Sequence, residues 1–219
     1  MNGAQKRAAA PKPRFTVPGL ELATAQEIVA DLDVRLAALV DLAMTLKHIH
    51  WNVVGPYFIG AHEMLDDHLE KVLPMVDETA ERIATLGGHP NGTPGHLVKT
   101  RTWDDYELGK ATVPEHMAAL DVVYIGLIED HRKLAESLDD RDLVTQDMIV
   151  GQIGTLELLH WLVRAHVESS AGEILTTFLD RESRRDESSR QGQVNSSPRR
   201  GTRVRFCMVA YNHVIHHVD

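Results

Sequence analysis

Two pairs of metal-binding side chains lie in the first half of the chain, and the members of each pair are one helical turn apart. His62 and Asp66 form one pair, and Asp77 and Glu81 form the other. At roughly 100° per residue, the four side chains point at about 0°, 40°, 60° and 100° around a helix and share one face. Imidazole and carboxylate ligands suit iron(II) or manganese(II), whereas zinc usually takes more histidine or cysteine. The spacing therefore predicts an iron or manganese site.

One helix cannot bring both pairs to a single ion. Asp66 and Asp77 are separated by about 16 Å of helix axis, far beyond the ~2 Å reach of a metal bond. The pattern is symmetrical about a point between Lys71 and Val72, which exchanges His62 with Glu81 and Asp66 with Asp77. Two antiparallel copies of this helix across a two-fold axis would therefore form two identical shared sites. For any single pair, the alternative is a solvated charged face.

Apolar periodicity predicts two helices that would position these side chains. The first begins at the capping box Thr24 to Glu27 and ends near His50, which can complete the histidine-rich half of each site. The second runs from about residue 59 to 86 and stops at a Gly-Gly pair. Pro74 lies inside it and is expected to kink it.

Two further helices complete the predicted fold. One begins at the capping box Thr112 to Glu115 and ends near Leu138, and the other follows Asp142 and ends near Leu179. Residues 89–108 predict a long crossover with a short helix at 103–108, and no strand pattern is present. The prediction is an all-α fold, a ferritin-like four-helix bundle with a long crossover between helices 2 and 3 and disordered tails.

Charge divides the chain into three parts. Residues 1–14 carry a net charge of +4 and residues 180–219 a net charge of +3. Because the whole chain carries −9, residues 15–179 carry −16. We therefore expect a basic N-terminal tail, a helical domain over 15–179, and an Arg-rich, disordered C-terminal tail. Cys207 is the only cysteine, so no disulfide framework is possible, and no stretch approaches 18 apolar residues. A cytoplasmic protein with no membrane partner is expected.

The site residues together resemble the Dps family, the DNA-protection proteins of starved cells. The resemblance is carried by the order His48-x-His50-Trp51-Asn52-x-x-Gly55, then His62 with Asp66, then Asp77 with Ala80-Glu81-Arg82, and it extends over about residues 15 to 175. It implies a hollow homododecamer that oxidises iron(II), preferentially with hydrogen peroxide, and stores the ferric product. His50, His62 and Asp66 would come from one subunit, and Asp77 and Glu81 from its two-fold mate.

The resemblance also implies roles beyond the ligands. Trp51 would lie beside the iron and intercept oxidising equivalents, with core packing as the alternative. Asp142, Thr145 and Asp147, and with less support Asp139, resemble the acidic lining of a pore through which iron enters. The alternative is that acids near the start of a helix oppose its dipole.

Basic tails suit nonspecific binding to DNA phosphates, which would place the protein at the nucleoid. The expected contacts are Lys6, Arg7, Lys12 and Arg14, with Arg184 and Arg185 from the C-terminal stretch. The alternative is a solubilising extension. The alternative function is a nucleoid-compacting structural protein without significant ferroxidase activity.

Two other histidine patterns are given no role. Glu157 and His160 match the Glu-x-x-His ligands of intrasubunit di-iron bundles, but no second copy of the motif is present. His213, His216 and His217 could bind a transition metal, but no structural partner for that end of the chain is visible in the sequence.

Overall fold

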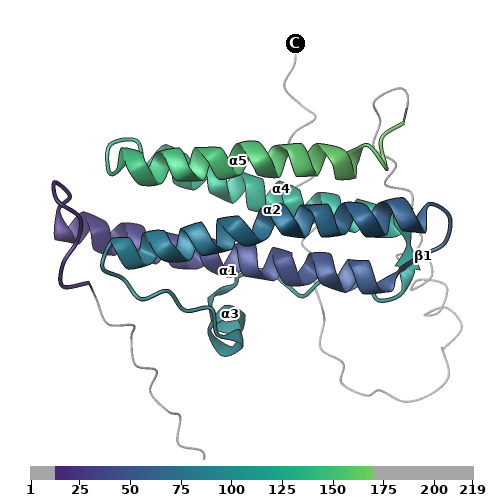
Figure 1. The fold of residues 1–219 in the computed structure, drawn as a ribbon, viewed down its shortest axis with the longest axis horizontal. Coiled ribbons are helices and arrows are strands. Elements are labelled where there is room, and N and C mark those ends of the chain that lie inside the picture. Colours follow the sequence, from purple (N-terminus) through teal and green to yellow (C-terminus); the bar gives the residue numbers. More distant parts are fainter. Residues whose placement is uncertain (1–12, 170–219) are drawn as a thin grey trace, which may run out of the picture. The chain divides into compact units, whose positions relative to one another are not determined.

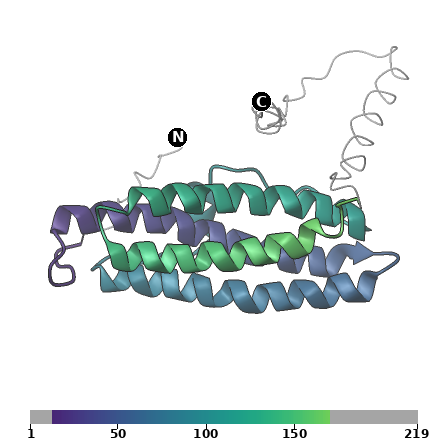
Figure 2. The same cartoon turned by 90° about the horizontal axis from the view of Figure 1, so that it is seen from above.

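A computed structural model describes residues 13–169 of the chain, and within them the predicted helical bundle is confirmed. Its long helices are α1 (Leu22–Asn52), α2 (Phe58–Thr85), α4 (Val113–Ser137) and α5 (Leu143–Arg164). They run alongside one another (Figure 1, Figure 2). The hairpin of α1 and α2 packs on the hairpin of α4 and α5. None of the helices in the described part is long and apolar enough to cross a membrane.

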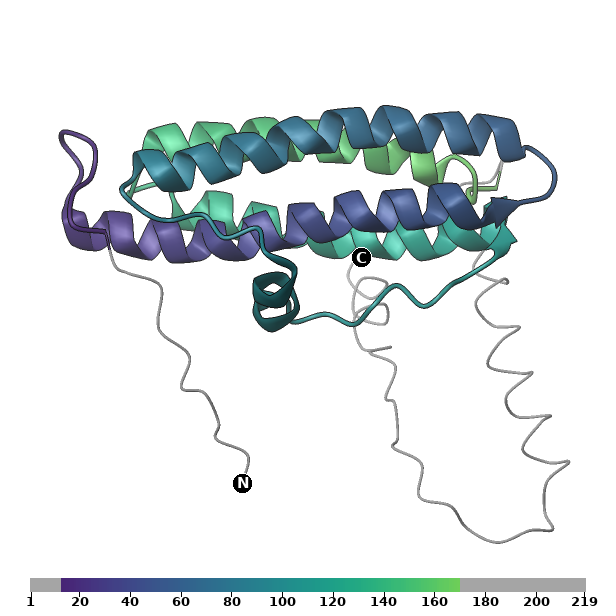
Figure 3. The same ribbon diagram turned by 60° about the horizontal axis from the view of Figure 1, so that its bottom comes forward.

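The predicted crossover joins α2 to α4 and runs along the outside of α1 (Figure 3). Its short helix is α3 (Pro94–Thr100), so the helix predicted at 103–108 is wrong. Proline in the first turn after Thr93 has a fixed φ that suits a helix start, which explains the earlier position. Trp103 lies outside any helix, and its indole nitrogen donates to Asp41 of α1 at 2.7 Å.

Local capping signals were predicted at the starts of α1, α4 and α5, and two of the three are confirmed. Thr112 and Glu115 form the predicted capping box of α4. Asp142 caps α5 by accepting from the backbone nitrogen of Thr145. The capping box predicted at Thr24 is wrong, because the N-cap of α1 is Glu21, three residues earlier, and its side chain makes no cap hydrogen bond. α5 ends at Arg164, and the predicted end near 179 lies outside the described residues.

Two short strands were not predicted. β1 (Val53–Val54) follows α1 and pairs in parallel with β2 (Ala111–Thr112), which precedes α4, in the register Val53 to Ala111. The expectation of a chain without strands is therefore wrong at this point. The ladder fixes the end of the crossover against the end of α1.

The core is divided by a polar layer. One apolar cluster fills the half of the bundle near β1, and a second fills the other half. Each long helix has a buried polar residue at the boundary between the two clusters or within one turn of it: Arg35, Thr79, His131 and Gln152. Gln152 donates to Thr79 at 3.1 Å, and Arg35 pairs with Asp130 at 3.3 Å.

α2 is continuous through its proline and ends in a glycine cap. Pro74 lies inside the helix without ending it. After Thr85, Gly87 has φ 83°, and the backbone nitrogen of Gly88 donates to the oxygen of Ile83 at 2.9 Å. This left-handed glycine and the hydrogen bond reaching back over the last turn are typical of a Schellman cap.

Candidate metal centre

A tight connection places the last turn of α1 beside the first turns of α2. Gly55 and Tyr57 both have positive φ, 93° and 65°, and the backbone nitrogen of Phe58 donates to the oxygen of Gly55 at 3.2 Å. The chain therefore reverses immediately after β1. As a result, His50 near the end of α1 faces His62 near the start of α2.

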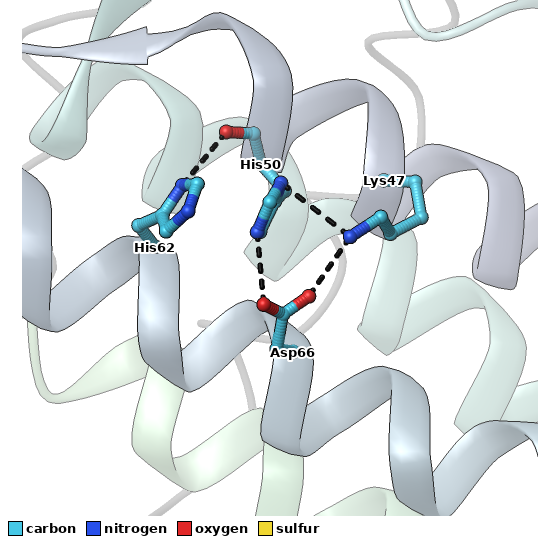
Figure 4. Close-up of polar contacts among 4 residues, drawn as sticks. All are labelled: Lys47, His50, His62 and Asp66. Atoms are coloured by element: carbon cyan, nitrogen blue, oxygen red, sulfur yellow. Dashed lines mark hydrogen bonds and ion pairs between the residues drawn. The ribbon is translucent and has the colours of Figure 1, made fainter.

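His50, His62 and Asp66 form a compact group of potential ligands (Figure 4). One ligand atom from each residue lies within 4.8 Å of the others. Ligands at roughly 2.1 Å from a shared ion can be at most about 4.2 Å apart, so small side-chain movements suffice to bind one. Within residues 13–169, this is the only such group of three or more histidine, cysteine or carboxylate side chains.

Hydrogen bonds orient both imidazoles. Nδ1 of His62 donates to the backbone oxygen of His50 at 3.0 Å, which leaves Nε2 as the nitrogen with a free lone pair. Nε2 of His50 lies 2.9 Å from Oδ2 of Asp66, and the two imidazole rings stack with centroids 3.5 Å apart. Two imidazoles and one carboxylate form a donor set typical of non-haem iron(II) sites that keep open positions.

Lys47 completes the group and was not predicted. Its ammonium donates to Oδ1 of Asp66 at 2.9 Å and lies 3.5 Å from Nδ1 of His50. The hydrogen bond from Lys47 is the main reason that the pKa of the Asp66 carboxyl is lowered, with a smaller contribution from His50. Lys47 stands one turn before His50, so helical spacing could have revealed it.

The other two predicted ligands lie elsewhere on α2. Asp77 and Glu81 are exposed and outside the group of three. About 16 Å of helix axis separates Asp77 from Asp66. The chain thus brings together three of the five predicted ligands. The completion of the site by a second subunit stays a prediction.

Trp51 lies at the outer edge of the group. Its side chain is 70% exposed, so the alternative that it packs in the core of its own chain is wrong. The ammonium of Lys47 is 6.0 Å from its ring centroid. Interception of oxidising equivalents by Trp51 stays a prediction.

The acids predicted to line a pore have different surroundings. Asp142 is bound by Arg82 and by Thr145, which is itself buried, so it acts as a helix cap and an ion-pair partner. Asp139 and Asp147 are exposed, and Asp139 accepts from Gln146 at 3.2 Å. Their role in iron entry stays a prediction.

Glu157 and His160 are engaged separately. Glu157 accepts from Arg132, and Nε2 of His160 lies 2.7 Å from Oδ1 of Asp121. Their side chains therefore do not form a joint ligand pair, in agreement with the missing second motif.

Most of the predicted DNA contacts lie outside the described residues. Arg14 is described and exposed. The other predicted contacts lie outside the described residues: Lys6, Arg7, Lys12, Arg184 and Arg185. His213, His216 and His217, which were given no role, also lie outside them.

Comparisons with known proteins agree with this geometry. The family model of the ferritin-like domain matches residues 29–171. A DNA protection during starvation protein of Mycolicibacterium smegmatis is 54% identical over 73% of this chain and 87% of its own length. A fine tangled pili major subunit of Haemophilus ducreyi is 47% identical over 73% of this chain and 84% of its own.

A solved structure extends the comparison to the fold. DpsA14 from Streptomyces coelicolor is 49% identical and superposes with a TM-score of 0.75, covering 77% of this chain and all of its own. The residues that the family model matches, 29–171, include His50, His62 and Asp66. The chain therefore belongs to the Dps family of ferritin-like proteins.

Proposed function

We propose that the protein is a ferroxidase and an iron store that protects DNA from oxidative damage. The observation that carries the proposal is the group of His50, His62 and Asp66, in which two imidazoles and a carboxylate converge at the end of one helical hairpin. The donor set suits iron(II), which is the substrate of the reaction. The similarity to a DNA protection protein supports the same conclusion.

In the proposed reaction, two iron(II) ions each give one electron to hydrogen peroxide. The oxygen–oxygen bond breaks, water supplies further oxygen, and protons are released as ferric oxyhydroxide forms. His62 binds through Nε2, because its Nδ1 is fixed by the backbone oxygen of His50. Asp66 supplies negative charge, which favours the ferric product over iron(II).

We propose that the site is completed by Asp77 and Glu81 of a two-fold related subunit. Both side chains are exposed on α2, the helix that carries His62 and Asp66. Antiparallel pairing of two α2 helices would join each histidine-rich half to an acidic half. The pairs would assemble into a hollow dodecamer that holds the mineral. Nonspecific DNA binding through the basic tails, in the cytoplasm at the nucleoid, is a second proposed activity.

Subunit complementation tests the shared site. Asp66→Asn impairs the histidine-rich half and Glu81→Gln impairs the acidic half, so each variant alone should lose peroxide-dependent iron(II) oxidation. In a mixed dimer, one of the two sites contains both variants and the other contains neither. Random co-assembly should therefore restore about a quarter of the wild-type activity.

Failure to restore activity in verified mixed assemblies would show that the two halves act within one chain. Wild-type oxidation no faster than the protein-free rate, and unchanged in the Asp66→Asn, Glu81→Gln double variant, would instead favour a structural, DNA-compacting protein. Particle mass adds a second criterion. A closed dodecamer supports a storage cage. An open filament would instead favour an assembly of the kind that the name of the Haemophilus ducreyi relative, a pili subunit, describes.

A further inference from the structure

An ammonium group lies within the proposed metal site. Lys47 and His50 are on successive turns of α1, and the Lys47 side chain is 23% exposed. Its Nζ donates to Oδ1 of Asp66 at 2.9 Å, while Nε2 of His50 is 2.9 Å from Oδ2. Both oxygens of Asp66 are therefore occupied by side chains of α1 (Figure 4). A divalent cation that binds this carboxylate must compete with a charge that the protein itself supplies.

Lys47 also acts on the imidazole. The carboxylate of Asp66 only accepts hydrogen bonds, so Nε2 of His50 carries the proton in this arrangement. Nδ1 then has the lone pair, and the Lys47 ammonium lies 3.5 Å from it. For His50 to bind a cation through Nε2, the proton must move to Nδ1. The N–H at Nδ1 would then face the Lys47 ammonium, which can only donate hydrogen bonds and cannot accept one. Lys47 thus favours the tautomer that does not bind metal at Nε2.

The ammonium has an alternative position nearby. Trp51 follows Lys47 by one turn, and its ring centroid is 6.0 Å from Nζ. The indole is 70% exposed, and lysine has a flexible four-carbon stem. A displaced ammonium can therefore lie against the indole face, where a cation is attracted by the ring quadrupole. Movement toward Trp51 would free Asp66 without returning the charge wholly to water.

From this geometry we infer that Lys47 is an internal counter-ion that fills the site before iron does and sets the iron concentration at which the site loads. The inference rests on the proposed function, because it assigns a regulatory role within the same site. A divalent ion interacts with Asp66 more strongly than a single ammonium does, so it displaces Lys47 when its concentration is high enough. Monovalent cations have no such advantage. Lys47 is a positioning residue, and the reaction does not consume its proton.

Metal binding tests the inference without turnover. The full-length, metal-free protein is titrated with Co²⁺ at pH 7 and constant ionic strength, and binding is followed by calorimetry and by the visible absorption of Co²⁺. Lys47→Gln should lower the dissociation constant about ten-fold, because the competing charge is gone. Lys47→Arg keeps a cation and should stay within about three-fold of wild type. Lys47→Met keeps an unbranched stem and replaces Lys47→Gln if that variant assembles poorly.

The matched control is Lys99→Gln, which removes the same charge from an exposed position on α3. It should leave the dissociation constant unchanged. If Lys47→Gln and Lys47→Met bind Co²⁺ as weakly as wild type or more weakly, Lys47 only orients Asp66 and the inference is wrong. Failure of the proposed site itself looks different, since wild type and Asp66→Asn would then bind Co²⁺ equally.

Discussion

Arg82 of α2 and Asp142 at the start of α5 form an ion pair in which the side chains are only 13% and 11% exposed. Arg82 also donates to Thr145 at 2.9 Å, and the same threonine donates its backbone hydrogen to Asp142. Burial raises the pKa of Asp142, but the hydrogen bonds from Thr145 and Arg82 outweigh it, and the net pKa is lowered. The two hairpins are therefore joined by a buried, charged contact.

Asp142→Ala should lower the free energy of unfolding by about 3 to 5 kcal/mol. The change removes the α5 cap and leaves Arg82 buried without its partner. Asp142→Asn keeps a cap acceptor and should cost less. Urea unfolding measures both, with Asp140→Ala at a neighbouring exposed position as the control. If Asp142→Ala slows iron uptake but leaves stability unchanged, the acid serves the pore and not the fold.

Gly87→Ala should destabilise the protein by at least about 2 kcal/mol. Gly87 has φ 83°, and an added Cβ would lie 2.1 Å from the backbone oxygen of Phe15. Both the left-handed backbone and the contact exclude a side chain. Gly92→Ala is the control, because a Cβ there meets nothing within 4 Å. Equal melting temperatures for the two variants would contradict the prediction.

Stability should fall on mild acidification because of His131. Burial lowers the pKa of this fully buried histidine to about 4, although its Nδ1 donates to Leu127. Between about pH 6.5 and pH 4 the unfolded chain binds a proton that the native chain does not. The free energy of unfolding therefore decreases as pH falls through this window, by at most about 3 kcal/mol for this group, and the loss is complete below it.

His131→Gln should remove this contribution. Urea unfolding at several pH values measures this. The free energy of unfolding should depend less steeply on pH for the variant than for wild type. The control is His89→Gln, which changes an exposed histidine. A slope that matches wild type between pH 4.5 and 6.5 would show that His131 is protonated in the native state.

The tails should account for DNA binding. Deletion of residues 1–14 and 180–219 removes twelve cations and five acids, and so lowers the charge by seven. Retardation of DNA in a gel at low salt should then be lost, and full-length binding should weaken steeply as salt rises. Iron(II) oxidation serves as the control for intact assembly. Retention of DNA by the truncated protein would place the contacts on the helical domain.

The fold was predictable where local patterns and packing agree. The Thr112–Glu115 capping box marks the start of α4, and apolar periodicity gave all four long helices. Thr24 has the same local pattern, yet α1 starts at Leu22 because the preceding turn, in which Leu20 donates to the oxygen of Val17, already directs the chain into the helix. The β1–β2 ladder is a backbone contact between distant segments, and no local pattern predicts it.

The candidate site was predictable as far as its residues are metal ligands. Spacing alone placed His62 and Asp66 on one face, and the structure brings His50 of α1, which was also predicted, beside them. Lys47 was not predicted because a lysine ammonium has no lone pair to offer a metal, although it donates a hydrogen bond to Asp66. Asp142 was assigned to a pore through the family resemblance, and the sequence does not show that it pairs with Arg82, 60 residues away.

The α1–α2 hairpin contains His50, His62 and Asp66 within one short stretch of chain. Contacts between such close segments cost little loop-closure entropy and can form early as the chain emerges and folds. The β1–β2 ladder, by contrast, can close only after the whole crossover has been synthesised. The contacts among the iron-binding residues are therefore local in the chain and can begin to form before the second hairpin has been synthesised.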